Sequence, residues 1–179
     1  MDPPVKPRDA TAVAADALTA LRGLIAVALV IAVGWRHPMS GAALLGLAWL
    51  TDVSDGRVAR RSATATRLGR WDLHFDAAVG AGLLTGLIAA GYVPGPAFAA
   101  AGGAATIWFL YAGNPAGAMA LQAVAYGPFL AVALRDATAG FWGLVGVLGS
   151  IAIVDARHLV EWVLPTFFAG LLSPRRPRR

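Results

Sequence analysis

The sequence predicts an all-α, polytopic membrane protein with six transmembrane helices and both termini in the cytoplasm. Three observations lead to this prediction. The 179-residue chain is 58% hydrophobic and only 14% charged, whereas soluble domains carry roughly 25% charged residues. Apolar stretches between Pro, Gly and charged breakers recur near the ~20-residue length that crosses a bilayer. Arg and Lys gather at one set of stretch ends, which indicates an orientation.

Six apolar stretches qualify, or nearly qualify, as membrane spans. The second is polar in its C-terminal part. A seventh apolar piece, about 159–172, is short and contains Glu161 and Pro165, so we predict an interfacial or partly buried helix there. The six spans are predicted over about 17–35, 38–60, 72–93, 95–112, 115–134 and 139–154.

Charge placement gives the orientation. With the N-terminus inside, thirteen of the fifteen Lys and Arg residues fall on one side, and Arg36 and Arg135 fall on the other. The positive-inside rule then places both termini in the cytoplasm of a bacterial-type plasma membrane. Residues 1–16 form a cytoplasmic segment, 17–172 one transmembrane domain and 173–179 a basic tail. The net charge of +5 is explained by this topology, so no nucleic-acid partner is predicted.

Small residues are dense in the fourth and sixth predicted spans, for example at 99–105. Such residues let helix backbones approach closely. They allow either packing within one bundle or a homodimer. The chain has no cysteine, which excludes disulfides and thiolate metal sites.

Four of the ten acidic residues lie at the cytoplasmic ends of the second and third predicted spans. Asp52 and Asp55 are three residues apart and share one helix face, and Asp72 and Asp76, four apart, share another. A short loop joins the two spans, so we predict that they are antiparallel neighbours. Their carboxylate pairs would then converge at one depth of the membrane.

The depth of these carboxylates indicates a metal. Asp52 lies ~21 Å along a helix that begins at Pro38, within a hydrocarbon core ~30 Å thick. Clustered carboxylates there must be protonated or hold a cation. Carboxylate oxygens suit Mg²⁺ or Mn²⁺, and two ions would balance four carboxylates. The alternative is a set of structural salt bridges with nearby arginines. These are Arg57, Arg60, Arg61, Arg67 and Arg70.

Residues 52–76 also form a motif. They read D-V-S-D-G-R-V-A-R, then eight residues, then G-R-W-D-L-H-F-D. This resembles the signature of the CDP-alcohol phosphotransferase (CDP-alcohol phosphatidyltransferase) family, D-x2-D-G-x2-A-R-x8-G-x3-D-x3-D. Residues 17–22 resemble the family's entry into its first helix, and the predicted six spans fit its fold. One departure is that two residues separate Gly69 from Asp72, where the family has three.

The resemblance implies an enzyme of phospholipid synthesis. It would transfer a phosphatidyl group from CDP-diacylglycerol to an alcohol, releasing CMP at the cytoplasmic face of the membrane. The implied ligands of Mg²⁺ or Mn²⁺ are Asp52, Asp55, Asp72 and Asp76, and Asp76 is also the implied catalytic base. The implied nucleotide-binding residues are Gly56, Ala59, Arg60 and Gly69.

Two other functions stay open. A carboxylate-based cation-binding protein, such as a transporter or channel, would need polar groups across the whole membrane depth. The fourth and fifth predicted spans offer few beyond Thr106, Asn114 and Gln122. A catalytically inactive family member that acts as a structural partner is the other alternative, motivated by the shortened spacing between Gly69 and Asp72.

Overall fold

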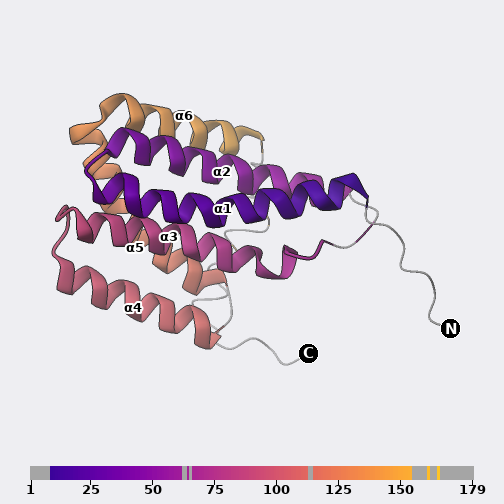
Figure 1. The fold of residues 1–179 in the computed structure, drawn as a ribbon, viewed down its shortest axis with the longest axis horizontal. Helices are drawn as coiled ribbons and strands as arrows, with labels where there is room; N and C mark the ends of the chain where they lie inside the picture. The colour runs from indigo at the N-terminus through magenta and orange to yellow at the C-terminus, as the bar shows by residue number, and fades with distance from the viewer. Residues whose placement is uncertain are drawn as a thin grey trace.

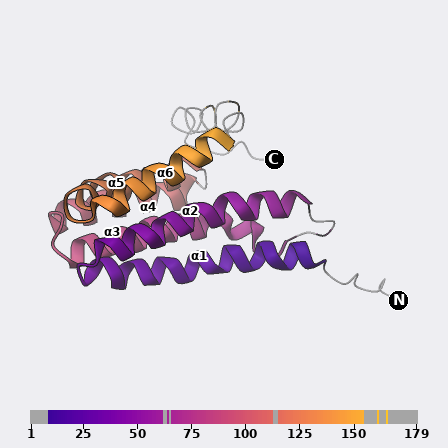
Figure 2. The ribbon, with the colours of Figure 1, turned by 90° about the horizontal axis from the view of Figure 1, so that it is seen from above.

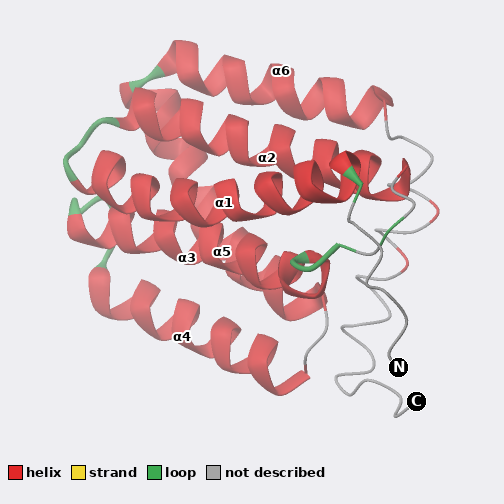
Figure 3. Ribbon diagram, turned by 45° about the vertical axis from the view of Figure 1, so that its right-hand side comes forward, coloured by secondary structure: helices red, strands yellow, loops and turns green. Residues whose placement is uncertain are grey.

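The computed structural model describes residues 9–61, 64, 66–112, 115–154, 161 and 165. This part of the chain contains six α-helices, one short 3₁₀ helix and no strand (Figure 3). The helices are α1 Ala10–Gly34, α2 Pro38–Arg61, η1 Gly69–Trp71, α3 Asp72–Ala89, α4 Gly95–Ala112, α5 Pro115–Asp136 and α6 Thr138–Val154. The prediction of six long helices is therefore confirmed. The predicted interfacial helix and the basic tail lie, apart from two single residues, outside the described part.

Helix α1 begins earlier than predicted because Asp9 caps it. The Asp9 side chain accepts a hydrogen bond from the Ala12 N–H at 2.7 Å, which satisfies one of the unpaired donors at a helix start. The extra turns carry α1 beyond the start of the predicted span, toward the segment that precedes α3. The Asp9 N–H there lies 3.3 Å from the Thr64 hydroxyl.

Helix α1 packs extensively against both α2 and α3 and lies between them in the view of Figure 1, whereas in Figure 2 it lies at the lower edge of the bundle. Helices α2 and α3, which the sequence predicts to be antiparallel neighbours, contact each other only slightly, because α1 packs against both. The seven residues between Arg61 and Gly69 can reach roughly 23 Å, which exceeds the 8–10 Å spacing of packed helices. Helix α6 covers α2, and α5 packs against α3 and α4.

Glycines on α3 permit its close contact with α1. A Cβ atom at Gly82 would clash with the Ala26 carbonyl oxygen, and one at Gly86 would lie 3.0 Å from the Leu29 carbonyl oxygen and 2.9 Å from Val33 Cβ. Small residues at such crossings let two backbones pack against each other directly. This contact brings the starts of α1 and α3 together at the end of the bundle where the acidic residues lie.

The outer faces of the helices are apolar. Among the described residues, three helical segments are long and apolar enough to cross a membrane, namely Ala10–Gly34, Gly69–Ala89 and Ala116–Asp136, and α6 is a shorter apolar helix. Several large hydrophobic side chains are more than half exposed; they include Leu24, Ile107, Leu110, Trp142 and Ile153. Such surfaces suit lipid rather than water, which agrees with the prediction of a membrane protein.

The end of the bundle away from the acidic residues is tied by Arg36. This residue has a positive φ of 60° in the turn between α1 and α2. Its Nε and Nη2 donate to the Ala90 carbonyl at 3.1 and 2.8 Å, and its guanidinium lies 5.8 Å from the centre of the Tyr92 ring. Two turns are thereby fastened to each other, at the left of Figure 1.

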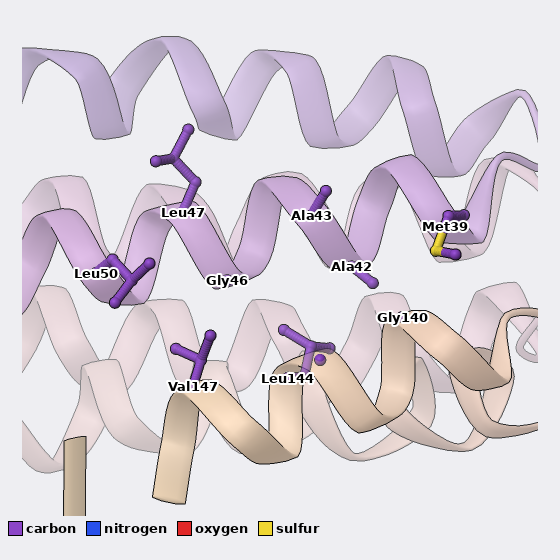
Figure 4. Close-up of a pocket in the computed structure, with 10 residues that line it drawn as sticks. Met39, Ala42, Ala43, Gly46, Leu47, Leu50, Gly140, Leu144 and Val147 are labelled. Atoms are coloured by element: carbon purple, nitrogen blue, oxygen red, sulfur yellow. The ribbon is translucent and has the colours of Figure 1, made fainter. Parts of the chain in front are cut away.

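An apolar groove of about 440 Å³ separates α2 from α6. Leu144 and Val147 of α6 point toward α2 (Figure 4). Gly46 of α2 and Gly140 of α6 have no side chain to fill the groove. The groove is lined only by apolar residues and glycine. It therefore offers no chemistry of its own, and the polar site lies elsewhere.

Candidate metal and phosphate site

Four aspartates and one arginine meet at the end of the bundle opposite Arg36. Asp52 and Asp55 come from α2, Asp72 and Asp76 from α3, and Arg22 from α1. The Arg22 guanidinium forms salt bridges with all four carboxylates. Its Nη1 contacts Asp52 Oδ1 at 2.8 Å and Asp76 Oδ1, and its Nη2 contacts Asp55 Oδ2 and Asp72 Oδ1. We call the four carboxylates the aspartate cluster.

Burial is uneven across the aspartate cluster. The Arg22 side chain is 1% exposed and that of Asp55 6%, whereas Asp76, Asp72 and Asp52 are 22%, 39% and 48% exposed. Asp55 Oδ2 also lies 3.1 Å from the Thr19 hydroxyl. Among the described residues, Arg22 Nε has no hydrogen-bond partner. The cluster is thus anchored on its α1 side and accessible on its other side.

The aspartate cluster has the oxygen ligands that a divalent cation requires. Asp52, Asp72 and Asp76 each offer one oxygen, and these three oxygens lie within 4.8 Å of one another. One guanidinium does not balance four ionised carboxylates, and carboxylate oxygens are the ligands that Mg²⁺ and Mn²⁺ prefer. Asp55 lies outside this group of three and joins it through Arg22. The residues present therefore fit a metal, with Asp55 in the position most enclosed by protein.

A first pocket of about 180 Å³ lies on the loop side of the cluster, and we call it the loop pocket. It is lined by Ala15, Thr19, Asp55, Gly56, Thr66, Gly69 and Asp72. It contains Gly56 and Gly69, two of the four predicted nucleotide-binding residues. A Cβ atom at Gly69 would clash with the Thr66 hydroxyl, so a residue with a side chain does not fit at this position of the pocket wall.

The other two predicted nucleotide-binding residues, Ala59 and Arg60, lie in the last turns of α2. Their side chains are outside the described part of the chain. Their roles in nucleotide binding stay predictions from the motif.

The segment before α3 is held by Asp16, a residue that the sequence analysis did not single out. Its carboxylate accepts hydrogen bonds from the Arg67 N–H at 3.2 Å and the Leu68 N–H at 2.9 Å. The next residues form the 3₁₀ helix Gly69–Trp71, and α3 begins at Asp72. The shortened spacing between Gly69 and Asp72 falls within this tighter helix. Asp72 nevertheless reaches the aspartate cluster.

A second pocket of about 110 Å³ lies on the other side of the cluster, and we call it the inner pocket. It is lined by Arg22, Ala48, Trp49, Asp52, Asp76, Val79, Gln122 and Tyr126. Gln122 Nε2 donates to the Asp76 backbone carbonyl at 3.4 Å. The Trp49 and Tyr126 rings meet edge to face, with centroids 5.7 Å apart. Helix α5 thereby closes the site with uncharged polar side chains.

Arg22 is the site residue that sequence reasoning missed, because it was counted among the charges that set topology. A signal existed. Between Asp16 and Arg36 the chain carries no other charged residue, and a charge within an apolar span marks a functional or paired position. His74 lies between Asp72 and Asp76 in the sequence, but it takes part in ring packing. Its ring packs edge to face against Trp71 and Phe109, at 5.1 and 5.2 Å between centroids.

Comparison with known proteins identifies one family. The family model described as CDP-alcohol phosphatidyltransferase matches residues 12–164, which include α2 to α6, all of α1 except its first two residues, and the residues that line both pockets. No curated protein and no solved structure matched the chain.

Proposed function

Because this chain belongs to the CDP-alcohol phosphatidyltransferase family, we propose that it transfers a phosphatidyl group from CDP-diacylglycerol to an alcohol and releases CMP. The single observation that best supports the proposal is the convergence of Asp52, Asp72 and Asp76, with oxygens within 4.8 Å of one another. Such a carboxylate group suits a divalent cation and the phosphates that it binds. The product would be a phospholipid.

The reaction exchanges one phosphorus–oxygen bond for another. The acceptor hydroxyl oxygen bonds to the lipid-side phosphorus, and the bond from that phosphorus to the bridging oxygen breaks. CMP leaves with the electron pair. We assign Asp76 to take the hydroxyl proton, because its carboxylate lines the inner pocket and is 22% exposed. A positioned carboxylate is a common general base.

We assign Asp52, Asp55, Asp72 and Asp76 as the residues that would hold Mg²⁺ or Mn²⁺, with two ions in the full site. Bound divalent cations neutralise the pyrophosphate and stabilise the departing CMP. Arg22 supplies a fixed positive charge at the buried side of the same carboxylates. Its planar fork keeps pairs from α2 and α3 at one depth.

We place the cytidine nucleotide in the loop pocket. Gly56 and Gly69 lie in its lining, and glycine lets a ligand approach the backbone closely. Ala59 and Arg60 follow one turn later on α2. Arg60 would there offer its guanidinium to a phosphate. The diacylglycerol chains stay in the bilayer, and the site faces the cytoplasm of a bacterial-type plasma membrane.

The test is an assay of the purified protein with CDP-diacylglycerol, a panel of alcohols, and either Mg²⁺, Mn²⁺ or EDTA. We expect CMP release that requires both an alcohol and a divalent cation, and a new phospholipid in equal amount. Absence of CMP release with every alcohol, at any metal concentration, from a folded sample would instead favour an inactive structural member of the family.

A further inference from the structure

The aspartate cluster has two sides along the bundle axis. Asp55 and Asp72 line the loop pocket, whereas Asp52 and Asp76 line the inner pocket. Arg22 divides its contacts in the same way, because Nη2 meets the first pair and Nη1 the second. The cluster and its arginine therefore separate two pockets that open on opposite sides of one charged centre.

Each helix of the site shows the same division in its sequence. On α1, Ala15 and Thr19 of the loop pocket precede Arg22; on α3, Asp72 of the loop pocket precedes Asp76. On α2, which runs the other way, the inner pocket comes first. The loop pocket thus lies toward the segment between α2 and α3, and the inner pocket lies deeper in the bundle, against α5.

Phosphoryl-type transfer places the attacking and leaving oxygens roughly in line, on opposite sides of the phosphorus. A nucleotide in the loop pocket would put the leaving oxygen on that side of the cluster. The attacking hydroxyl then has to approach from the inner pocket, where Asp76 lies.

We propose that the inner pocket is the acceptor subsite and takes the hydroxyl-bearing end of a small polar alcohol. Gln122 and Tyr126 of α5, with Ala48 and Trp49 of α2, are its specificity-determining residues. This inference rests on the proposed function and adds to it the place and size of the second substrate.

The chemistry of the lining supports an alcohol. Gln122, Tyr126 and Trp49 carry uncharged donors and acceptors, and a site built to bind a hydroxyl needs such groups. The volume of about 110 Å³ has room for roughly four water molecules at ~30 Å³ each. This is the scale of a short polyol or amino-alcohol end.

Charge decides which part of the acceptor enters. Two carboxylates, Asp52 and Asp76, border the inner pocket, and Arg22, its cationic lining residue, is already paired with the aspartate cluster. Apart from the divalent cations that these carboxylates would hold for the pyrophosphate, the lining offers an anionic group no free cation, because its other residues, Ala48, Trp49, Val79, Gln122 and Tyr126, are uncharged. The part of the acceptor within the pocket is therefore uncharged, and any phosphate that the acceptor carries lies outside it.

Three variants test the assignment. Ala48→Leu adds volume to the pocket wall, Gln122→Leu removes the amide at similar size, and Gln122→Ala enlarges the pocket. The matched control is Ala43→Leu, the same change on the same helix at an exposed position in the apolar groove of Figure 4. For each variant, the KM for the best acceptor and the KM for CDP-diacylglycerol are measured separately, and folding is checked by thermal unfolding in detergent.

We expect Ala48→Leu and Gln122→Leu to raise the acceptor KM by about tenfold or more, with the KM for CDP-diacylglycerol within about twofold of wild type. Gln122→Ala should shift the order of preference in the alcohol panel toward larger acceptors. Ala43→Leu should change neither KM. If Ala48→Leu does not fold, the two Gln122 variants carry the test.

An unchanged acceptor KM in the folded Gln122 variants, or a rise confined to the KM for CDP-diacylglycerol, would overturn the acceptor subsite. Both results require an active wild-type protein. Failure of the proposed function is a different outcome, because wild-type protein would then release no CMP with any alcohol.

Discussion

Arg22 links all four carboxylates of the aspartate cluster through two nitrogens, whereas the ammonium of a lysine would offer only one nitrogen. Its two terminal nitrogens each bridge one carboxylate of α2 and one of α3, and a guanidinium presents these donors in a rigid plane. The side chain is 1% exposed, so water cannot replace it. Removal of one partner from such a buried set leaves like charges facing one another.

We therefore expect Arg22→Gln to lower the free energy of unfolding by about 3–5 kcal/mol and to lose CMP release. Added Mg²⁺ should stabilise this variant more than it stabilises wild type, because the cation replaces the missing positive charge. Thermal unfolding in detergent, with and without Mg²⁺, measures both effects.

The control for this prediction is Arg135→Gln. Arg135 pairs with Asp136 at the exposed end of α5, where an ion pair adds little to stability. The unfolding temperature of the Arg135→Gln variant should match that of the wild-type protein. Equal stability of Arg22→Gln and wild type in the absence of metal would show that Arg22 does not hold the carboxylates together.

The Asp76 carboxylate is assigned to proton transfer, and Asp76→Asn removes its basicity at almost unchanged size. We expect transfer to fall at least about 100-fold, while the protein stays folded with wild-type thermal unfolding. The measurement is CMP release at saturating substrates. Wild-type turnover by this variant would remove Asp76 from the mechanism.

At the scale of elements, sequence spacing was sufficient to predict the six helices, and it was sufficient to predict that both aspartates of α2 lie on one helix face and both aspartates of α3 on another, since all four reach Arg22. It was not sufficient to predict that α1 packs against both α2 and α3. That arrangement depends on close backbone contact, such as Gly82 against Ala26, which no local pattern reveals. The position of α1 also brings Arg22 to the carboxylates. Without the arrangement of the helices, the role of Arg22 could therefore not be predicted either.

The segment before α3 offers a prediction at the same scale. Asp16 accepts two consecutive backbone N–H groups, from Arg67 and Leu68, next to Gly69 of the loop pocket. We expect Asp16→Ala to raise the KM for CDP-diacylglycerol by about tenfold, because a displaced loop reshapes the nucleotide side. The acceptor KM should change much less. Steady-state kinetics with each substrate varied in turn measures this difference.

Asp136→Ala serves as the control for Asp16→Ala, since it removes an aspartate at the opposite end of the bundle and should leave both KM values unchanged. A wild-type KM for CDP-diacylglycerol in Asp16→Ala would mean that the two hydrogen bonds do not position the loop pocket.

Across the whole molecule the two ends of the bundle differ in kind. One end is closed by Arg36, which fastens the turn before α2 to the turn after α3. The other end carries the aspartate cluster and both pockets. The sequence predicted this difference between the two ends, because the difference follows from which ends of the apolar stretches carry Arg and Lys. The depth of the two pockets could not be predicted, because each combines residues from at least three helices.

The difference between the two ends leads to a prediction about orientation. The chain has no cysteine, so a single introduced thiol reports its own side of the membrane. His37 lies exposed in the turn between α1 and α2, and Arg67 lies exposed at the other end of the bundle. With both termini in the cytoplasm, a membrane-impermeant thiol reagent added to intact cells should label His37→Cys and spare Arg67→Cys. Inverted membrane vesicles should give the reverse, because only the cytoplasmic face is then accessible. Unaltered protein, which cannot react, sets the background. Labelling of Arg67→Cys in intact cells would place the aspartate cluster on the outer face, where cytosolic CDP-linked substrates could not reach it.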